Sequence, residues 1–272
     1  MPAISVIIVS HNKPTFVLQA VQSVLAQSFQ DWEAFLVDSG VLLKQGFFDK
    51  ISDARVRVMA SGEKLDVSHN IDMASWCMNK VLNSGAVKGE LILYLCDDDY
   101  FYPRAFDIFW GYYQSLNREP QAMYASQNVG VVGADGTTVL IGQRIADRPA
   151  GRFCKGRQLH GQVDYLQFCH TVKILEKYRE IYGTTKYFCE DKPAVCGGAD
   201  GIFLEQIGAL TMVHPINQIV SINRRTSLSV NCGHGSDRKP QKWMPHPEKW
   251  SRRFERGFRK FWRRCLGWKQ KS

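Results

Sequence analysis

The stretch LILYLCDDDYFYP, residues 91–103, runs an apolar segment directly into three carboxylates, Asp97, Asp98 and Asp99. Adjacent aspartates repel one another and are poor strand formers. At the end of a buried strand they suit a divalent cation, because Mg²⁺ and Mn²⁺ take carboxylate oxygens as ligands. The alternative is a solvated loop whose acids only cap the helix that begins near Pro103. The buried strand in front of the acids favours the cation site.

Apolar strands alternate with helices over the first hundred residues. The patterns predict strands over 4–9, 32–38, 56–61 and 90–99, and helices over 13–27 and 72–85. Continuous apolar strands joined by helices indicate a parallel, doubly wound sheet, in which ligands bind beyond the carboxyl ends of the strands. Three polar clusters follow strands in this way: SHN at 10–12, DSG at 38–40 and DDD at 97–99.

The second half of the chain is less regular. We expect helices over 104–116, 165–183 and 200–209, with a strand and a hairpin over 122–145. A segment with Pro and Gly at 231–247 reads as a linker, and 248–272 reads as a basic amphipathic helix. The expected organisation is therefore one domain over 1–230, with a regular half (1–103) and a less regular half (104–230), followed by the linker and the tail.

Composition narrows the class of protein. Apolar residues make up 44% of the 272-residue chain, which is ordinary for a protein with a core. We find no apolar run of the roughly 18 residues that a membrane span needs, and the first residues lack the pattern of a signal peptide. The eight cysteines form no C-x-x-C pair, so we expect reduced thiols and a cytoplasmic protein.

The positive charge is concentrated at the end of the chain. Residues 238–272 carry a formal charge of +11, whereas the rest carries −2. Aromatic residues recur mostly three or four apart through 248–271, with Arg and Lys between them, which is typical of a helix lying on an anionic membrane surface. The same stripe could instead pack on the protein's own core or on a partner subunit. Nucleic acid is the less favoured alternative, since aromatic and basic residues also bind single strands.

Three motifs carry a resemblance to a known family. ISVIIVSHNKPTFVLQAVQSVLAQSFQDWEAFLVDSG (4–40), GELILYLCDDDYFYP (89–103) and GGADGIFLEQIG (197–208) together resemble family 2 glycosyltransferases with the GT-A fold, over roughly residues 3–225. Within the family the likeness is strongest to a spore-coat polysaccharide glycosyltransferase. The resemblance implies a Rossmann-like, mixed and mainly parallel sheet flanked by helices. It also implies a nucleoside-diphosphate-sugar donor bound with Mn²⁺ or Mg²⁺, with 1–103 as the nucleotide-sugar-binding half and 104–230 as the acceptor half.

The resemblance also implies roles for single residues. Asp98 is the expected metal ligand, with Asp99 assisting, and Asp97 and Asp98 lie near the donor. The residues expected to bind the nucleotide sugar at the other strand ends are Ser10, His11, Asn12, Asp38 and Ser39. Asp38 could instead only form a turn, and His11 could simply pack beside the strand end.

The second half supplies the expected base. The resemblance places a catalytic base at Asp200, which could alternatively serve only as a helix cap; Asp191 is the second candidate. His170 would open a helix and touch the donor, or it could be a packed structural residue. The chain departs from the family pattern at Cys96, at Val41 and in lacking the family's arginine before residues 78–79, which leaves the nucleotide open between uridine and thymidine.

The sequence thus favours a metal-dependent, inverting transferase that uses a UDP- or dTDP-sugar. The acceptor would be a glycan or a lipid-linked glycan in surface polysaccharide or glycolipid synthesis, with the enzyme cytoplasmic and bound to the inner face of the membrane through 248–271. Two alternatives stay open. One is transfer to protein or modified nucleic acid, and the other is a domain that binds nucleotide sugars without catalysis.

Overall fold

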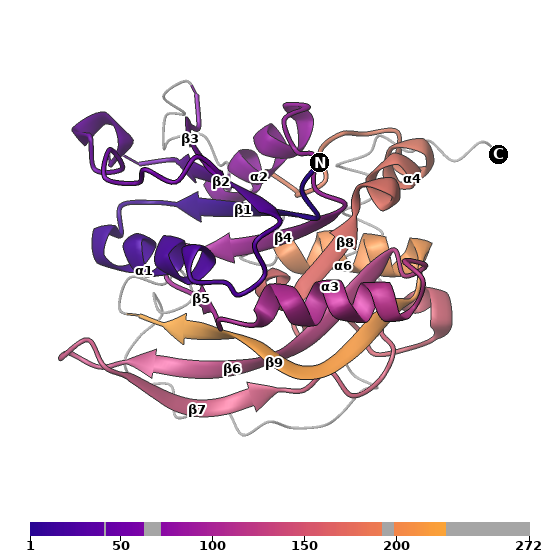
Figure 1. The fold of residues 1–272 in the computed structure, drawn as a ribbon. Helices are drawn as coiled ribbons and strands as arrows, with labels where there is room; N and C mark the ends of the chain where they lie inside the picture. Colours follow the sequence, from indigo (N-terminus) through magenta and orange to yellow (C-terminus); the bar gives the residue numbers. More distant parts are fainter. Residues whose placement is uncertain (41, 63–71, 192–198, 227–272) are drawn as a thin grey trace. The chain divides into compact units, whose positions relative to one another are not determined.

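The computed structural model describes residues 1–40, 42–62, 72–191 and 199–226, which form a sheet with helices on both faces (Figure 1). The first half contains β1 (Ile4–Ser10), α1 (Pro14–Leu25), β2 (Trp32–Asp38), η1 (Leu43–Gln45), β3 (Val56–Ala60), α2 (Met73–Asn83), β4 (Leu91–Cys96) and β5 (Tyr100–Phe101). The second half contains α3 (Ala105–Ser115), β6 (Ala122–Val132), β7 (Thr138–Arg144), η2 (Arg152–Cys154), η3 (Tyr165–Gln167), β8 (Phe168–Thr171), α4 (Val172–Tyr182), α6 (Ala199–Leu210) and β9 (Val213–Arg225).

The sheet is mixed, as expected. Its strand order within the described residues is β3-β2-β1-β4-β8-β6-β9-β5, with β7 paired to β6. The strands β3, β2, β1 and β4 run parallel. Beyond β4, the short strand β8 runs antiparallel to both β4 and β6, and β6 pairs in parallel with β9. The carboxyl ends of β1, β2 and β4 therefore lie side by side, with Ser10 opposite Asp38 and Val9 opposite Cys96.

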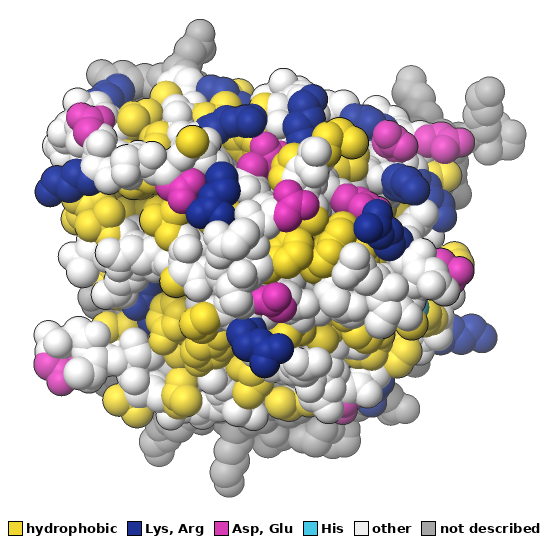
Figure 2. All heavy atoms as spheres, viewed as in Figure 1, with side chains coloured by type: hydrophobic (Ala, Val, Ile, Leu, Met, Phe, Trp, Pro, Cys, Tyr) yellow, Lys and Arg dark blue, Asp and Glu magenta, His cyan; other side chains and the backbone are white. Residues whose placement is uncertain are grey.

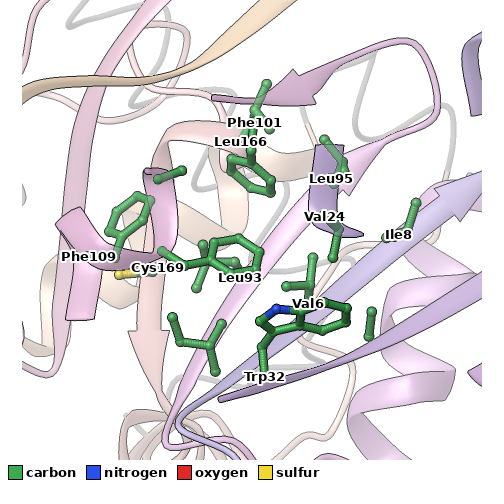
Figure 3. Packing of buried hydrophobic residues seen from close by; sticks show 14 of the residues in the cluster. Val6, Ile8, Val24, Trp32, Leu93, Leu95, Phe101, Phe109, Leu166 and Cys169 are labelled. Carbon is green, nitrogen blue, oxygen red and sulfur yellow. The ribbon is translucent and has the colours of Figure 1, made fainter. Parts of the chain in front are cut away.

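Both faces of the central strands are buried, which explains their continuous apolar sequences. Alternate residues of each strand point to opposite faces. On one face, Val6 and Leu93 pack with α1 and α3; Figure 3 shows Val24 of α1 and Phe109 of α3 in this cluster. On the other face, residues such as Tyr94 pack against α2, α4 and α6. The result is three layers, helix, sheet and helix, with an apolar core on each side of the sheet.

The segment 165–183 differs from its predicted single helix. The structure divides it into η3, the strand β8 and the helix α4. All four residues of β8 are buried, because the strand fills the position between β4 and β6. A short strand that is buried on both faces has no alternation to distinguish it from a helix. The long strand β9 was not predicted as a strand either, and its sequence is only partly apolar.

The predicted linker at 231–247 and the predicted basic helix at 248–272 lie outside the described residues, and both stay predictions. Within the described part, no helix is long and apolar enough to cross a membrane. The described cysteines, Cys77, Cys96, Cys154, Cys169 and Cys189, are free thiols. Figure 2 shows Lys and Arg interspersed with Asp and Glu on the face drawn there, in keeping with the small net charge of residues 1–237.

Leu93→Ala tests the core on the α1 side. Leu93 is fully buried in β4, between β1 and β8. Its truncation should lower the free energy of unfolding by about 2–5 kcal/mol, because apolar contacts are lost and a cavity is left. Urea denaturation followed by circular dichroism measures the change. Ile181→Ala, at a position of α4 that is 58% exposed, is the matched control and should change the free energy little; equal losses in the two variants would contradict the assigned core.

Candidate active site

The three carboxylates lie at the carboxyl end of β4 and are nearly removed from solvent. Asp97, Asp98 and Asp99 are 3%, 7% and 3% exposed. Burial, with the charge of neighbouring Asp98, raises the pKa of Asp99. Three buried acids at adjacent positions require compensating charge or hydrogen-bond donors, and the structure shows where these come from.

Lys13 supplies the first compensating charge. It stands just before Pro14, and its Nζ donates to Asp97 Oδ1 at 2.9 Å and to Asp98 Oδ2 at 2.8 Å. Burial alone would lower the pKa of the ammonium, but the two carboxylates raise it above its ordinary value. Sequence analysis did not predict Lys13 as a site residue. Its place in SHNKP, at the end of β1, was the available signal.

The predicted residues at the ends of β1 and β2 do come together with the acids. The backbone N–H of His11 donates to Asp97 Oδ2 at 2.7 Å, and His11 Nδ1 lies 3.1 Å from Ser39 Oγ. Ser39 Oγ in turn donates to the carbonyl of Ser10 at 2.9 Å. Asn12 adopts a left-handed backbone with φ of 54°. A Cβ at Gly40 would lie 2.1 Å from the side-chain oxygen of Asn12, so a larger residue at position 40 would force the Asn12 side chain to move.

Asp38 has a local structural role. Its carboxylate is 3% exposed and accepts from the backbone N–H groups of Leu43 at 3.0 Å and Gly40 at 3.3 Å. The bond from Gly40 is that of an Asx turn after β2, the alternative that the sequence left open. The bond from Leu43 ties the start of η1 to the same carboxylate. A contact between Asp38 and a nucleotide base stays a prediction.

Asp99 is held by the last described strand. Its carboxylate accepts from the backbone N–H of Arg224 at 2.6 Å and from Asn223 Nδ2 at 3.2 Å. Sequence analysis did not predict any residue of β9 at this site. Neither NRR at 223–225 nor its surroundings carries a local motif that would have indicated it.

Asp200, the predicted base, lies in the first turn of α6 and is partly buried. Burial raises the pKa of its carboxyl to about 7, aided by the negative charge of Asp164 and opposed by the Gly201 N–H and by Arg144. Its Oδ1 accepts from Gly201 N at 2.8 Å, so it also satisfies one N–H of the helix start. A carboxyl that titrates near neutral pH suits a general base.

The other two predicted residues of the second half lie in different surroundings. His170 is a core residue of β8, not the start of a helix, and is fully buried. Its Nε2 lies 2.7 Å from Tyr94 Oη, and burial lowers the pKa of the ring to about 4. This geometry is that of a packed, neutral histidine. Asp191 is exposed, next to Glu190, which pairs with Lys186 at 3.1 Å.

A divalent cation fits the donor atoms near Asp97, Asp98 and Asp99, which we call the acid triplet. One donor atom each from Cys96, Asp98 and Asp99 lies within 4.8 Å of the others. Burial and the three aspartates raise the pKa of the Cys96 thiol, and the Asp99 carboxylate already accepts two hydrogen bonds. Asp98, whose Oδ2 accepts from Lys13 Nζ, stays the predicted metal ligand. Mg²⁺ is commonly held by one or two carboxylates together with substrate phosphates and water, and this arrangement suits that mode.

Lys13→Met tests the charge balance of the triplet. Removal of the ammonium leaves Asp97 and Asp98 without their shared cation, which should lower the free energy of unfolding by about 3–5 kcal/mol near neutral pH. Burial already raises the pKa of Asp97, and losing Lys13 raises it further. A carboxyl with a raised folded-state pKa stabilises the fold as the pH falls, so the deficit should shrink between about pH 8 and about pH 5.

Urea denaturation at the two pH values measures this change. Lys173→Met, on the exposed side of α4, is the matched control and should be neutral at both. A deficit for Lys13→Met that does not depend on pH would show that the ion pair is not the source of the stability.

Known proteins resemble this chain over the segments that form the site. The family model described as Glycosyl transferase family 2 matches residues 5–118, which include the ends of β1, β2 and β4. Protein CgeD of Bacillus subtilis (strain 168) is 25% identical over 230 residues, covering 82% of this chain and 50% of that protein. The chain thus spans about half the length of this curated relative.

Among solved structures, TarS of S. aureus (residues 1–349) in complex with UDP-GlcNAc superposes with a TM-score of 0.55. The sequence identity is 13%, and the match covers 83% of this chain and 59% of that one. The UDP complex of the same protein gives a TM-score of 0.53 at 13% identity, over 84% and 61% of the two chains. The expected likeness to a spore-coat polysaccharide glycosyltransferase stays a prediction. The fold matches that of GT-A type glycosyltransferase structures, which confirms the predicted mixed sheet flanked by helices.

Proposed function

We propose that this chain is an inverting glycosyltransferase that moves a sugar from a UDP- or dTDP-linked donor to an acceptor hydroxyl, with Mn²⁺ or Mg²⁺ at Asp98. The observation that carries the proposal is the convergence of the acid triplet, Lys13 and the SHN turn at the carboxyl ends of three parallel strands. The family match over residues 5–118 supports it. The UDP-GlcNAc and UDP complexes of TarS support a uridine donor.

The donor would lie across the strand ends. Ser10, His11, Asn12 and Ser39 form the turn next to the triplet, where a nucleotide can bind beyond the sheet. A cation bound at Asp98 would supply Lewis-acid neutralisation of the leaving diphosphate. Lys13 already places a positive charge at the same carboxylates, so it can turn to phosphate oxygens when a donor arrives. Asp99 is engaged with β9 and would support the site through that contact.

Asp200 would act as the base. In a single displacement, the acceptor oxygen forms a bond to the anomeric carbon while the bond from that carbon to the diphosphate breaks. The acceptor's proton passes to the Asp200 carboxylate, and the nucleoside diphosphate leaves with the electron pair. A carboxyl with a pKa of about 7 accepts this proton readily near neutral pH. Asp191 is the alternative base, and His170 would support the site from the core instead of touching the donor.

The acceptor side is inferred from chemistry alone. A glycan or a lipid-linked glycan, in surface polysaccharide or glycolipid synthesis, fits a basic aromatic tail that brings the domain to an anionic membrane. The segment 248–271 lies outside the described residues, and its sequence is what supports this part of the proposal. A cytoplasmic enzyme at the inner face of the membrane would follow.

Nucleotide binding tests the donor site. Isothermal titration calorimetry with UDP, dTDP, GDP and CDP, each with and without MnCl₂, should show uptake of UDP or dTDP that Mn²⁺ strengthens about tenfold or more, because the cation bridges carboxylate and phosphate. Asp98→Asn should remove the strengthening. Asp135→Asn, at an exposed position of the β6–β7 turn, should retain it. Absence of metal-assisted binding for every nucleotide with the wild-type chain would refute the proposed function.

The pH dependence of transfer tests the base. With a cleavable donor and its acceptor, kcat/KM of the wild type should rise with pH through about 7, because the carboxyl of Asp200 must lose its proton to act as a base. Asp200→Asn should lower kcat by about 100-fold or more and leave nucleotide affinity nearly unchanged. If Asp191→Asn, and not Asp200→Asn, abolishes transfer, the role belongs to Asp191.

A further inference from the structure

The strand β9 reaches the acid triplet from the far end of the described chain. Arg224 N and Asn223 Nδ2 both donate to the Asp99 carboxylate. These residues are separated from Asp99 by 125 and 124 positions in the sequence. The antiparallel pairing of β5 with β9, which sets Tyr100 opposite Ile222, brings them there. The triplet is thus bound on one side by Lys13 and on the other by β9.

The side chain of Arg224 makes a second set of contacts with the same turn. Its Nε donates to the main-chain carbonyl of Asp98, and its Nη1 donates to Gln19 Oε1 of α1. The guanidinium lies 5.0 Å from the ring centre of Phe16 and 4.9 Å from that of Tyr100, within cation–π range. These contacts come from α1, β5 and the acid turn, so one side chain ties three elements together.

Burial of this guanidinium is costly, and its hydrogen bonds offset that cost only in part. Arg224 is 4% exposed, and its Nη2 has no hydrogen-bond partner among the described residues. A buried charge of this kind commonly stabilises a fold less than an apolar side chain of the same size would. A role at the adjacent site explains why a charged, fork-shaped donor occupies this place.

We propose that Arg224 is a positioning residue of the donor and metal site, which holds the turn of Asp98 and Asp99 so that the Asp98 carboxylate faces the cation. This inference rests on the proposed function. Nε fixes the Asp98 carbonyl, and the backbone N–H of the same residue fixes the next carboxylate along the chain. Because the main chain is held at both points, the Asp98 side chain can adopt few orientations. Little conformational entropy is therefore lost when metal and diphosphate bind.

The proposal predicts that arginine cannot be replaced by lysine here. Lysine keeps the positive charge, but it has no Nε–H at the place that reaches the Asp98 carbonyl and no planar fork to span that carbonyl and Gln19. Since the backbone N–H to Asp99 survives in any variant, loss of the side-chain contact alone should loosen the turn and leave the fold intact. The quantity affected is the coupling between metal and nucleotide, not nucleotide binding by itself.

Calorimetry on the full chain measures that coupling as the ratio of UDP dissociation constants without and with MnCl₂. Arg224→Lys should lower the ratio about tenfold and keep the metal-free dissociation constant within about twofold of the wild type. Gln19→Ala removes the Nη1 acceptor at an exposed position and should lower the ratio about threefold without endangering the fold. Arg225→Gln, at the exposed neighbouring position, is the matched control and should keep the wild-type ratio.

The outcomes separate this inference from the proposed function. If Gln19→Ala and Arg224→Lys both keep the wild-type ratio of UDP dissociation constants, the positioning role of Arg224 is wrong, but the proposed donor site is not affected. If Arg224→Lys does not fold, Gln19→Ala decides: a reduced ratio supports the role, and a wild-type ratio overturns it. A wild-type chain that shows no effect of Mn²⁺ on UDP binding refutes the proposed function and this inference with it. An equal loss in Arg225→Gln would also overturn the inference, because the coupling would then respond to any side-chain change at the end of β9 and not to the contacts of Arg224.

Discussion

Burial of three adjacent carboxylates at the end of β4 is the constraint on which the rest of this site depends. An isolated buried carboxylate is strongly disfavoured, and here three share one turn. The chain meets this demand from two directions. The ammonium of Lys13 bridges Asp97 and Asp98, and the backbone and side chain of Arg224 hold Asp98 and Asp99. Each partner comes from a different part of the sequence, so the acidic turn exists in this form only when the sheet is complete.

The same constraint links stability to function. Protein cations hold this cluster of carboxylates. In the proposed function, a metal would compete with Lys13 for the carboxylate oxygens, and a diphosphate would compete with the carboxylates for the Lys13 ammonium. Lys13 can leave the carboxylates without breaking a strand, because it stands in the loop before α1. Arg224 is part of β9, packed between two rings. In the proposed function the two cations would therefore have different tasks: Lys13 would turn to the donor phosphates, and Arg224 would keep the turn in place.

The second half of the chain adds a carboxyl of different character. The triplet is compensated by direct ion pairs and hydrogen bonds, whereas no ion pair to Asp200 is among the described contacts. Burial and the nearby Asp164 raise its pKa, and Arg144, which pairs with Asp164 at 2.8 Å, opposes this. The environment of the acid triplet suits binding of cations, whereas the environment of Asp200 suits acceptance of a proton near neutral pH. This division of roles is what the proposed transfer reaction requires.

The sequence alone determined the elements whose signals are local. Continuous apolar runs predicted β1, β2, β3 and β4, helical spacing predicted α1, α2 and α3, and the polar residues after the strands predicted which edge of the sheet carries the site. These follow from short-range periodicity and from the rule that parallel strands end together.

Tertiary structure decided the rest. The strand β8 inside a predicted helix, the placing of His170 in the core and the arrival of Arg224 beside Asp98 depend on contacts between residues far apart in the chain. No local pattern encodes such contacts, because burial on both faces removes the period, and a lone arginine in a strand gives no sign of its partner until the sheet brings the two together.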